Sequence, residues 1–382
     1  MRREIREETL EVSRRIYEYA ELGSQEYRSS KLMAEHLSRH GFTVEMPYGG
    51  MDTAFKATCY RGGPTVGLLA EYDALPNGHS CGHNLIAAWA LGTAVTLCED
   101  FGISITVFGT PSEEGIGPYA GSKAILVEKN LIRDVDFVMG MHPDDRWAVG
   151  SVSLADLTIE AEFRGRSSHL LGPDYGINAL APAIETYIAL NNLRSSISDL
   201  KRPVIGMIIK EGGKASNVIP DRSVMEIDLR SSKRTYLEDL YGKTREIIAS
   251  ISRMHSCEFT IRDVTPLYDE YISNETIDDM LEEELRSLGV DPVNIHRVNE
   301  PAMGSTDEAN VSHVVPTGHI DVKIVQPSIP AHTDEFRMAA DPDRAAEVLT
   351  IGIEAAAGAA AKIVRDRSLM KRMKNEFKEA IR

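Results

Sequence analysis

The chain has 382 residues, of which 42% are hydrophobic and 26% are charged, and its formal net charge is −16. That length is enough for two domains with separate cores, and the composition is ordinary for a globular protein. The acidic balance argues against general binding of nucleic acid, which needs an excess of Lys and Arg to meet phosphates. The longest apolar stretch, 85–97, is interrupted by Gly92 and Thr93 and is too short to cross a bilayer.

The amino-terminal sequence and the cysteines bear on the compartment. The first eight residues carry charges of both signs without an apolar run, which is unlike a secretory signal, so we expect a cytoplasmic protein. Cysteines in a reducing compartment are thiols unless they bind metal. We therefore expect buried thiols at Cys59, Cys98 and Cys257.

Helices and short strands alternate in the first 150 residues. Apolar residues fall at helical spacing over 2–40, with Gly23 as an interruption. The elements expected next are strands 54–58 and 65–70, helix 85–98, strand 104–109, helix 120–129 and strand 137–140. Strands that alternate with helices indicate an α/β fold with a largely parallel, mixed sheet.

Between about 151 and 267 the pattern changes to longer strands in which polar and apolar residues alternate. We expect strands at 155–163, 204–209, 223–230 and 258–263, with helices at 179–193 and 235–254 between them. This order predicts a compact α+β layer of the β-α-β-β-α-β, ferredoxin-like, kind. After 267, helices and short strands return, and an Ala-rich helix is expected at 345–365.

Two domain arrangements fit this order of elements. Either three units follow one another, or the middle segment is inserted into a larger domain. Candidate metal ligands occur on both sides of the middle segment, and a single site has to collect them, which favours insertion. The expected domains are a catalytic, metal-binding domain of 1–153 and 268–382 and an inserted lid or dimerisation domain of 154–267.

Two pairs of residues carry metal chemistry. Cys81 and His83 flank a glycine, and thiolate with imidazole suits Zn, Mn, Ni or Co. Glu113 and Glu114 follow an apolar strand, where one carboxylate can bind metal while its neighbour takes a proton from water. Taken singly, the first pair could be a chance Cys-x-His and the second a solvated acidic turn.

Two histidines extend the set, because His142 follows strand 137–140 and His332 follows the apolar run 322–325. In α/β proteins functional groups gather at the carboxyl ends of strands. Five protein ligands are enough for two divalent ions with positions left open for water, as in catalytic sites. These candidate ligands are Cys81, His83, Glu114, His142 and His332. A nucleophilic hydrolase using Cys81 with His83 is a rival, although neighbours on one loop seldom form such a pair with a third, orienting group.

Residues 71–76, EYDALP, followed by 78–84, GHSCGHN, resemble the aminoacylase and carboxypeptidase-G type of metallopeptidase. The match is to the amidohydrolase branch, which includes auxin-conjugate, hippurate and aminobenzoyl-glutamate hydrolases. The resemblance runs nearly end to end and includes 165–169, 212–221, 228–230 and 304–307. It implies a metallopeptidase-type catalytic domain with an inserted dimerisation domain.

The resemblance also implies roles for single residues. The five candidate ligands match the metal ligands of the branch, with the Cys81 thiolate able to bridge two ions. Glu113 matches the general base, and Asp73 matches the acidic residue that orients a ligand. The wider family has His-x-Asp where this chain has Glu71, which favours Cys81 as a ligand.

Three further residues match the family in the middle segment. His169 matches a histidine that, in family dimers, reaches the partner's active site and helps to stabilise the oxyanion. Asn217 and Arg230 match residues that hold the substrate's carboxylate, a task that suits the planar fork of Arg. From the residues alone, Asn217 could equally be a turn residue and Arg230 a surface cation.

The resemblance implies hydrolysis of an amide bond by water that two divalent ions (Zn, Mn, Ni or Co) activate. The expected substrate is an N-acyl or N-aroyl amino acid, an aminobenzoyl-glutamate-like conjugate or a dipeptide, in each case with a carboxylate, and the expected assembly is a homodimer. A metal-binding regulatory or carrier homologue without catalysis is the alternative. It is disfavoured because Glu113 is retained beside the full ligand set.

Overall fold

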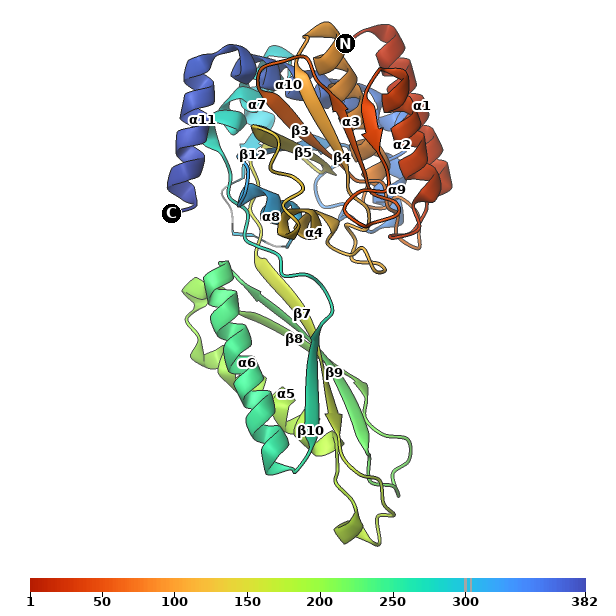
Figure 1. The fold of residues 1–382 in the computed structure, drawn as a ribbon, viewed down its shortest axis with the longest axis vertical. Helices are drawn as coiled ribbons and strands as arrows, with labels where there is room; N and C mark the ends of the chain where they lie inside the picture. The colour runs from red at the N-terminus through yellow and green to blue at the C-terminus, as the bar shows by residue number, and fades with distance from the viewer. Residues whose placement is uncertain (299–300, 303) are drawn as a thin grey trace. The chain divides into compact units, whose positions relative to one another are not determined.

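The computed structural model describes residues 1–298, 301–302 and 304–382. The chain divides into two compact units (Figure 1). The larger unit consists of Met1–Val152, Tyr271–Pro301 and Asp307–Arg382, and the smaller unit of Ser153–Glu270 and Ala302–Thr306. The sequence placed the inserted segment at 154–267; the structure adds a few flanking residues and the short return segment 302–306 to it.

The larger unit contains a mixed eight-stranded sheet, which confirms the predicted fold class. Its strand order is β1-β2-β4-β3-β5-β12-β6-β11, and the run β4-β3-β5-β12 is parallel. The bounds are β1 Thr43–Glu45, β2 Phe55–Cys59, β3 Thr65–Ala70, β4 Ser104–Gly109, β5 Phe137–Asp144, β6 Trp147–Val149, β11 Ile295–Arg297 and β12 Thr317–Lys323.

Helices cover both faces of this sheet (Figure 1). The strands are buried on both sides: Leu68 of β3 belongs to the main core with α3, while its neighbour Leu69 belongs to a second core with α4 and α8. This double burial explains why the parallel strands are continuous apolar runs. The helices are α1 Arg3–Tyr19, α2 Tyr27–Arg39, α3 His83–Val95, α4 Ser122–Glu128, α7 Glu275–Ser287, α8 Glu308–Ser312, α9 Asp334–Ala339, α10 Pro342–Arg365 and α11 Arg367–Ala380.

The smaller unit is a four-stranded antiparallel sheet, of order β10-β7-β9-β8, with two helices packed on one face. Side chains alternate along β7, so that Leu157 and Ile159 enter the core while Thr158 points the other way. The predicted order of strands and helices is confirmed. The elements are β7 Ala155–Arg164, α5 Leu180–Ser196, β8 Val204–Glu211, β9 Arg222–Ser231, α6 Arg234–Met254 and β10 Glu258–Asp263, with short 3-10 turns at Pro173–Tyr175, Asp199–Lys201 and, in the larger unit, Pro292–Asn294.

Some local expectations were wrong. The helical stretch 2–40 is two helices joined by a turn at 20–26, strand β5 continues through His142 rather than ending before it, and α11 was not expected. Cys59 and Cys98, expected as thiols, form a disulfide, while Cys257 is a buried thiol as expected. The disulfide arises because the end of β2 and a π-helical turn at Thr96–Asp100 bring the two Cα atoms to 6.3 Å, within the usual range for such a bond.

Among the described residues, no helix is both long enough and apolar enough to cross a membrane.

Candidate metal centre

The candidate ligands converge at one edge of the larger sheet because they lie at or near the carboxyl ends of its parallel strands. Strand β3 leads to Asp73, strand β4 leads to the Glu113–Glu114 pair, and β5 carries His142 in its second half. A tight turn at Gly82, which has a φ of +78°, brings Cys81 and the first residue of α3 to the same place. This is where open α/β sheets collect functional groups.

Three groups of side chains could each hold a cation, and in each group the ligand atoms all lie within 4.8 Å of one another. The groups overlap, because Cys81 belongs to two of them and His83 belongs to two. Cys81 Sγ lies 3.4 Å from His142 Nε2, and His332 Nε2 lies 3.3 Å from Glu114 Oε1. The groups are Cys81 with His83 and His142, Cys81 with Glu114 and His332, and Glu71 with His83 and Glu113.

Several buried atoms in these groups suit a metal because nothing in the described chain hydrogen-bonds to them. His83 Nε2, Glu71 Oε2 and Glu114 Oε1 are all in this position, whereas buried polar atoms normally have partners. Cations bound among them would satisfy all three. The donor set of thiolate, imidazole and carboxylate fits borderline ions such as Zn²⁺.

Neighbouring groups fix the histidine rings so that Nε2 faces the centre. His83 Nδ1 lies 2.9 Å from Asp73 Oδ1, and since a carboxylate only accepts, Nδ1 carries the proton. The other oxygen of Asp73 accepts from the Glu114 backbone N–H at 3.1 Å. His142 Nδ1 donates to the Pro143 carbonyl oxygen at 2.8 Å. Asp73 thus orients one candidate ligand and anchors the backbone of another, as partners of metal-binding histidines usually do.

His332 differs from the other candidates because its side chain is 55% exposed. Its backbone has a φ of +70°, and its N–H donates to the Ser80 carbonyl oxygen at 2.8 Å, which ties this segment to the turn before Cys81.

Two residues of the centre were missed in the sequence. Lys123 of α4 is fully buried, its Nζ lies 2.9 Å from Glu71 Oε1, and it forms an ion pair with Asp307. The Asp307 carboxylate also accepts from the Lys123 backbone N–H at 3.0 Å. Asp307 belongs to a segment that the family resemblance had marked, but a lysine within a short helix gives no signal of burial.

The carboxyl groups around Lys123 have pKa values that diverge. Burial, and then the charge of Glu71, hold the pKa of Glu113 well above its usual value. The pKa of Glu71 is lowered because Lys123 and His83 outweigh the effect of burial. Carboxyl groups with such divergent environments are typical of acid–base sites.

His169, Asn217 and Arg230 all lie in the smaller unit, but not together. The first two are adjacent and exposed, because His169 pairs with Val218 in an isolated bridge and the Leu170 N–H donates to the Asn217 carbonyl oxygen at 3.0 Å. They lie beyond the end of β9 that begins with Arg222, whereas Arg230 is near the other end. Eight residues of strand separate these ends by about 26 Å.

Arg230 does not present a free fork. Its Nη2 lies 3.0 Å from Asp228 Oδ2 and 3.4 Å from Asp156 Oδ2, and its Nη1 donates to Ser305 Oγ at 3.3 Å. Asp156 is largely buried, which together with the charge of Asp228 raises its pKa to about 7. Two carboxyl groups therefore share one guanidinium at this end of the sheet.

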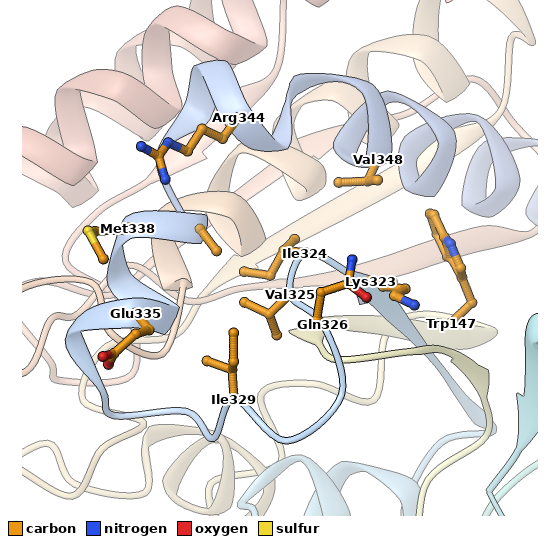
Figure 2. A pocket seen from close by; sticks show the side chains of 11 residues that line it. Trp147, Lys323, Ile324, Val325, Gln326, Ile329, Glu335, Met338, Arg344 and Val348 are labelled. Carbon is orange, nitrogen blue, oxygen red and sulfur yellow. The ribbon is translucent and has the colours of Figure 1, made fainter.

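A separate hollow of about 480 Å³ lies between the end of β12, the segment 324–329 and helices α9 and α10 (Figure 2). Its wall combines apolar side chains such as Trp147 and Ile329 with the charged Lys323, Glu335 and Arg344. No candidate metal ligand lines it, so it is distinct from the metal centre.

Comparisons with known proteins agree with this geometry. Residues 149–254 match the family model of a peptidase dimerisation domain of the M20 type. The chain is 30% identical to the Xaa-Arg dipeptidase of Mus musculus over 389 residues, covering 96% of this chain and 88% of that protein. It is 26% identical to one of the proteins that form the p-aminobenzoyl-glutamate hydrolase of Escherichia coli, covering 74% and 63% respectively.

Solved structures share the fold. A Bacillus subtilis protein described as a dinuclear metal-binding peptidase of the M20 family matches with a TM-score of 0.69 and 18% identity, covering 95% of this chain and 99% of that one. A putative aminohydrolase from methicillin-resistant Staphylococcus aureus matches with a TM-score of 0.77 and 19% identity, covering 94% and 97%. The chain belongs to the M20 family of metallopeptidases and is a hydrolase of peptide or amide bonds.

Proposed function

We propose that the protein is a metal-dependent amidohydrolase that cleaves an amide bond next to a carboxylate, in an N-acyl amino acid, an aminobenzoyl-glutamate-like conjugate or a dipeptide. The observation that carries this proposal is the cluster of candidate ligands with Glu113 among them. A non-catalytic metal carrier would have no use for this carboxylate beside a full ligand set.

Two divalent ions, of Zn, Mn, Ni or Co, are proposed to bind Cys81, His83, Glu114, His142 and His332. When bound, they would polarise the amide carbonyl and make a water acidic enough to lose a proton near neutral pH.

Glu113 is the proposed general base. Its carboxylate lies 3.9 Å from His83 Nε2, at the edge of the metal cluster, where it can take a proton from the attacking water and pass it to the leaving nitrogen. Asp73 serves by holding His83 and the Glu114 backbone in place.

The substrate groups are proposed to fall to the smaller unit. Arg230 would bind the carboxylate, with Asn217 as a second contact, and His169 would stabilise the oxyanion. An extended dipeptide is only about 7 Å long, so the two ends of β9 cannot serve the same substrate molecule in one protomer. We therefore propose a homodimer in which His169 and Asn217 of one protomer complete the metal centre of the other.

A dimer surface is available on the smaller unit. Strand β8 is at the edge of its sheet, and its Val204, Ile208 and Ile209 are exposed, as are Ile184 and Ile188 on α5. Exposed apolar side chains beside a free strand edge indicate an interface. The match to a dimerisation domain covers this surface.

The surroundings of Arg230 favour one part of the substrate class. Because Asp156 and Asp228 outnumber the guanidinium, this end of the sheet suits a group that carries a positive charge near its carboxylate. A dipeptide with a basic carboxyl-terminal residue has this property, and one relative is a Xaa-Arg dipeptidase. Aminobenzoyl-glutamate, with a second carboxylate, fits less well.

The roles of the two adjacent glutamates give the direct test. Glu113→Gln should abolish turnover and keep two equivalents of metal, whereas Glu114→Gln should lose metal. Loss of metal in the first variant would exchange the two roles. A fully active chelated enzyme would instead support a nucleophilic Cys81.

The cytoplasmic location stays a prediction. The Cys59–Cys98 disulfide argues against a reducing compartment, and counting free thiols in protein taken from its own cells decides between them.

A further inference from the structure

Glu26 is a buried carboxylate in the turn between α1 and α2. Its side chain is fully buried, and in the described parts of the chain no lysine, arginine or histidine pairs with it. Instead, its Oε1 accepts from the backbone N–H groups of Ser24 and Ser112, both at 2.9 Å, and its Oε2 accepts from Thr53 Oγ1 at 2.9 Å. A buried carboxylate without a cation is costly, so its retention needs a reason.

The reason lies in the segment that Glu26 holds. Ser112 immediately precedes the Glu113–Glu114 pair and has a φ of +57°, in the left-handed region that a serine rarely adopts. Its hydroxyl is also hydrogen-bonded to Ser24 Oγ at 2.8 Å. The turn that aims the two glutamates is therefore fixed from below by a side chain 86 residues away in the sequence.

The same turn reaches the other loop of the metal centre. The Ala74 N–H donates to the Glu21 carbonyl oxygen at 2.8 Å, directly after Asp73, and the Glu114 N–H donates to Asp73. Residues 21–26 thus hold both strand-end loops at once. Removing the Glu26 contacts frees the loop of Glu113 while leaving the backbone contact of the Asp73 loop intact.

We propose that Glu26 is a positioning residue for hydrolysis, which sets the orientation of the Glu113 carboxylate through the turn at Ser112. The inference rests on the proposed role of Glu113 as general base. It concerns a residue that contacts none of the candidate metal ligands.

Glu21 offers a matched control. It is a carboxylate in the same turn, and it too accepts from backbone N–H groups, those of Arg28 and Ser29 at the start of α2. Its side chain has no contact with the loop of Glu113. Glu21→Ala should therefore cost stability, as Glu26→Ala does, without changing the chemistry.

The experiment measures kcat, KM, metal content and thermal unfolding at saturating metal. Glu26→Ala should lower kcat about tenfold to a hundredfold, as expected for a catalytic group misplaced by roughly 1 Å, with KM and metal content close to those of the parent. Glu21→Ala should keep kcat. Equal kcat in Glu26→Ala and the parent, or equal losses in both alanine variants, would overturn the proposal.

Two further variants keep the test open where Glu26→Ala does not fold. Glu26→Gln retains an oxygen for both backbone N–H groups and an amide for Thr53, and should keep most of kcat. Glu26→Asp retains the charge but is one methylene too short, and should lose kcat; the reverse order would overturn the proposal. Activity in Glu113→Gln would contradict the proposed function itself, whereas an active Glu26→Ala beside an inactive Glu113→Gln would contradict only the positioning role.

Discussion

Two inactive variants of this protein should restore each other's activity when mixed. Glu113→Gln removes the proposed base in the larger unit, and His169→Ala removes the proposed oxyanion contact in the smaller unit. If His169 serves the metal centre of the other protomer, a mixed dimer contains one site with both substitutions and one site with neither. Each variant alone should be inactive or nearly so.

The magnitude follows from the symmetry of the dimer. Random exchange of equal amounts makes half of the dimers mixed, and each of these has one intact site of two, so the mixture should regain about a quarter of the parent's specific activity. The structural basis is the separation of about 26 Å between the His169 and Arg230 ends of β9, which a small substrate cannot bridge within one protomer.

The assay needs two tags, so that exchange of protomers can be measured beside amine release. Recovery near a quarter, rising with the fraction of mixed dimers, is the expected result. No recovery in a sample with half of its dimers mixed would refute the reasoning, because it would mean that His169 acts within its own chain or not at all.

Other expected outcomes concern the buried charges and the disulfide. Lys123→Met should lower the free energy of unfolding, measured with denaturant, by about 3–5 kcal/mol, because it leaves two buried carboxylates without their cation. Burial raises the pKa of Asp278 to about 7, so the folded protein retains a proton between about pH 4 and 7 that the unfolded chain has lost, and stability falls as pH rises through this window. Asp278→Asn should remove that fall, gaining up to about 4 kcal/mol at pH 8 relative to pH 4. The adjacent Asp279, although partly buried, has a pKa lowered by its ion pairs with two arginines, so Asp279→Asn should lose stability near neutral pH and have little effect below the ordinary carboxyl range. Cys59→Ser should cost about 4 kcal/mol under oxidising conditions, from the length of the closed loop, and a reductant should then have no further effect on thermal unfolding.

The pattern of apolar residues was sufficient to predict the fold. Strands β3 and β4 were located to the residue, because their continuous apolar runs between Gly and Pro turns have few other interpretations. The candidate ligands could be found for the same reason, since each follows or belongs to such a run. The break between α1 and α2 was harder, because Gly23 alone does not show that the turn is a structural support.

The missed residues are charged side chains that the fold buries. Lys123 and its partner Asp307 are 184 residues apart, and Glu26 and Ser112 are 86 apart. In the sequence such residues look like ordinary surface charges, and only the folded chain shows their partners. The opposite positions of His169 and Arg230 along β9 were likewise invisible until strand register was known.

Metal removal and restoration test the central claim most directly. The chelated protein would be assayed for amine release from N-acyl amino acids, aminobenzoyl-glutamate and dipeptides with basic or neutral carboxyl-terminal residues, before and after addition of Zn, Mn, Ni or Co. The account expects no activity without metal and restored activity with at least one ion, strongest on the basic dipeptides. Full activity in the chelated protein, or none with any ion despite two bound equivalents, would contradict it.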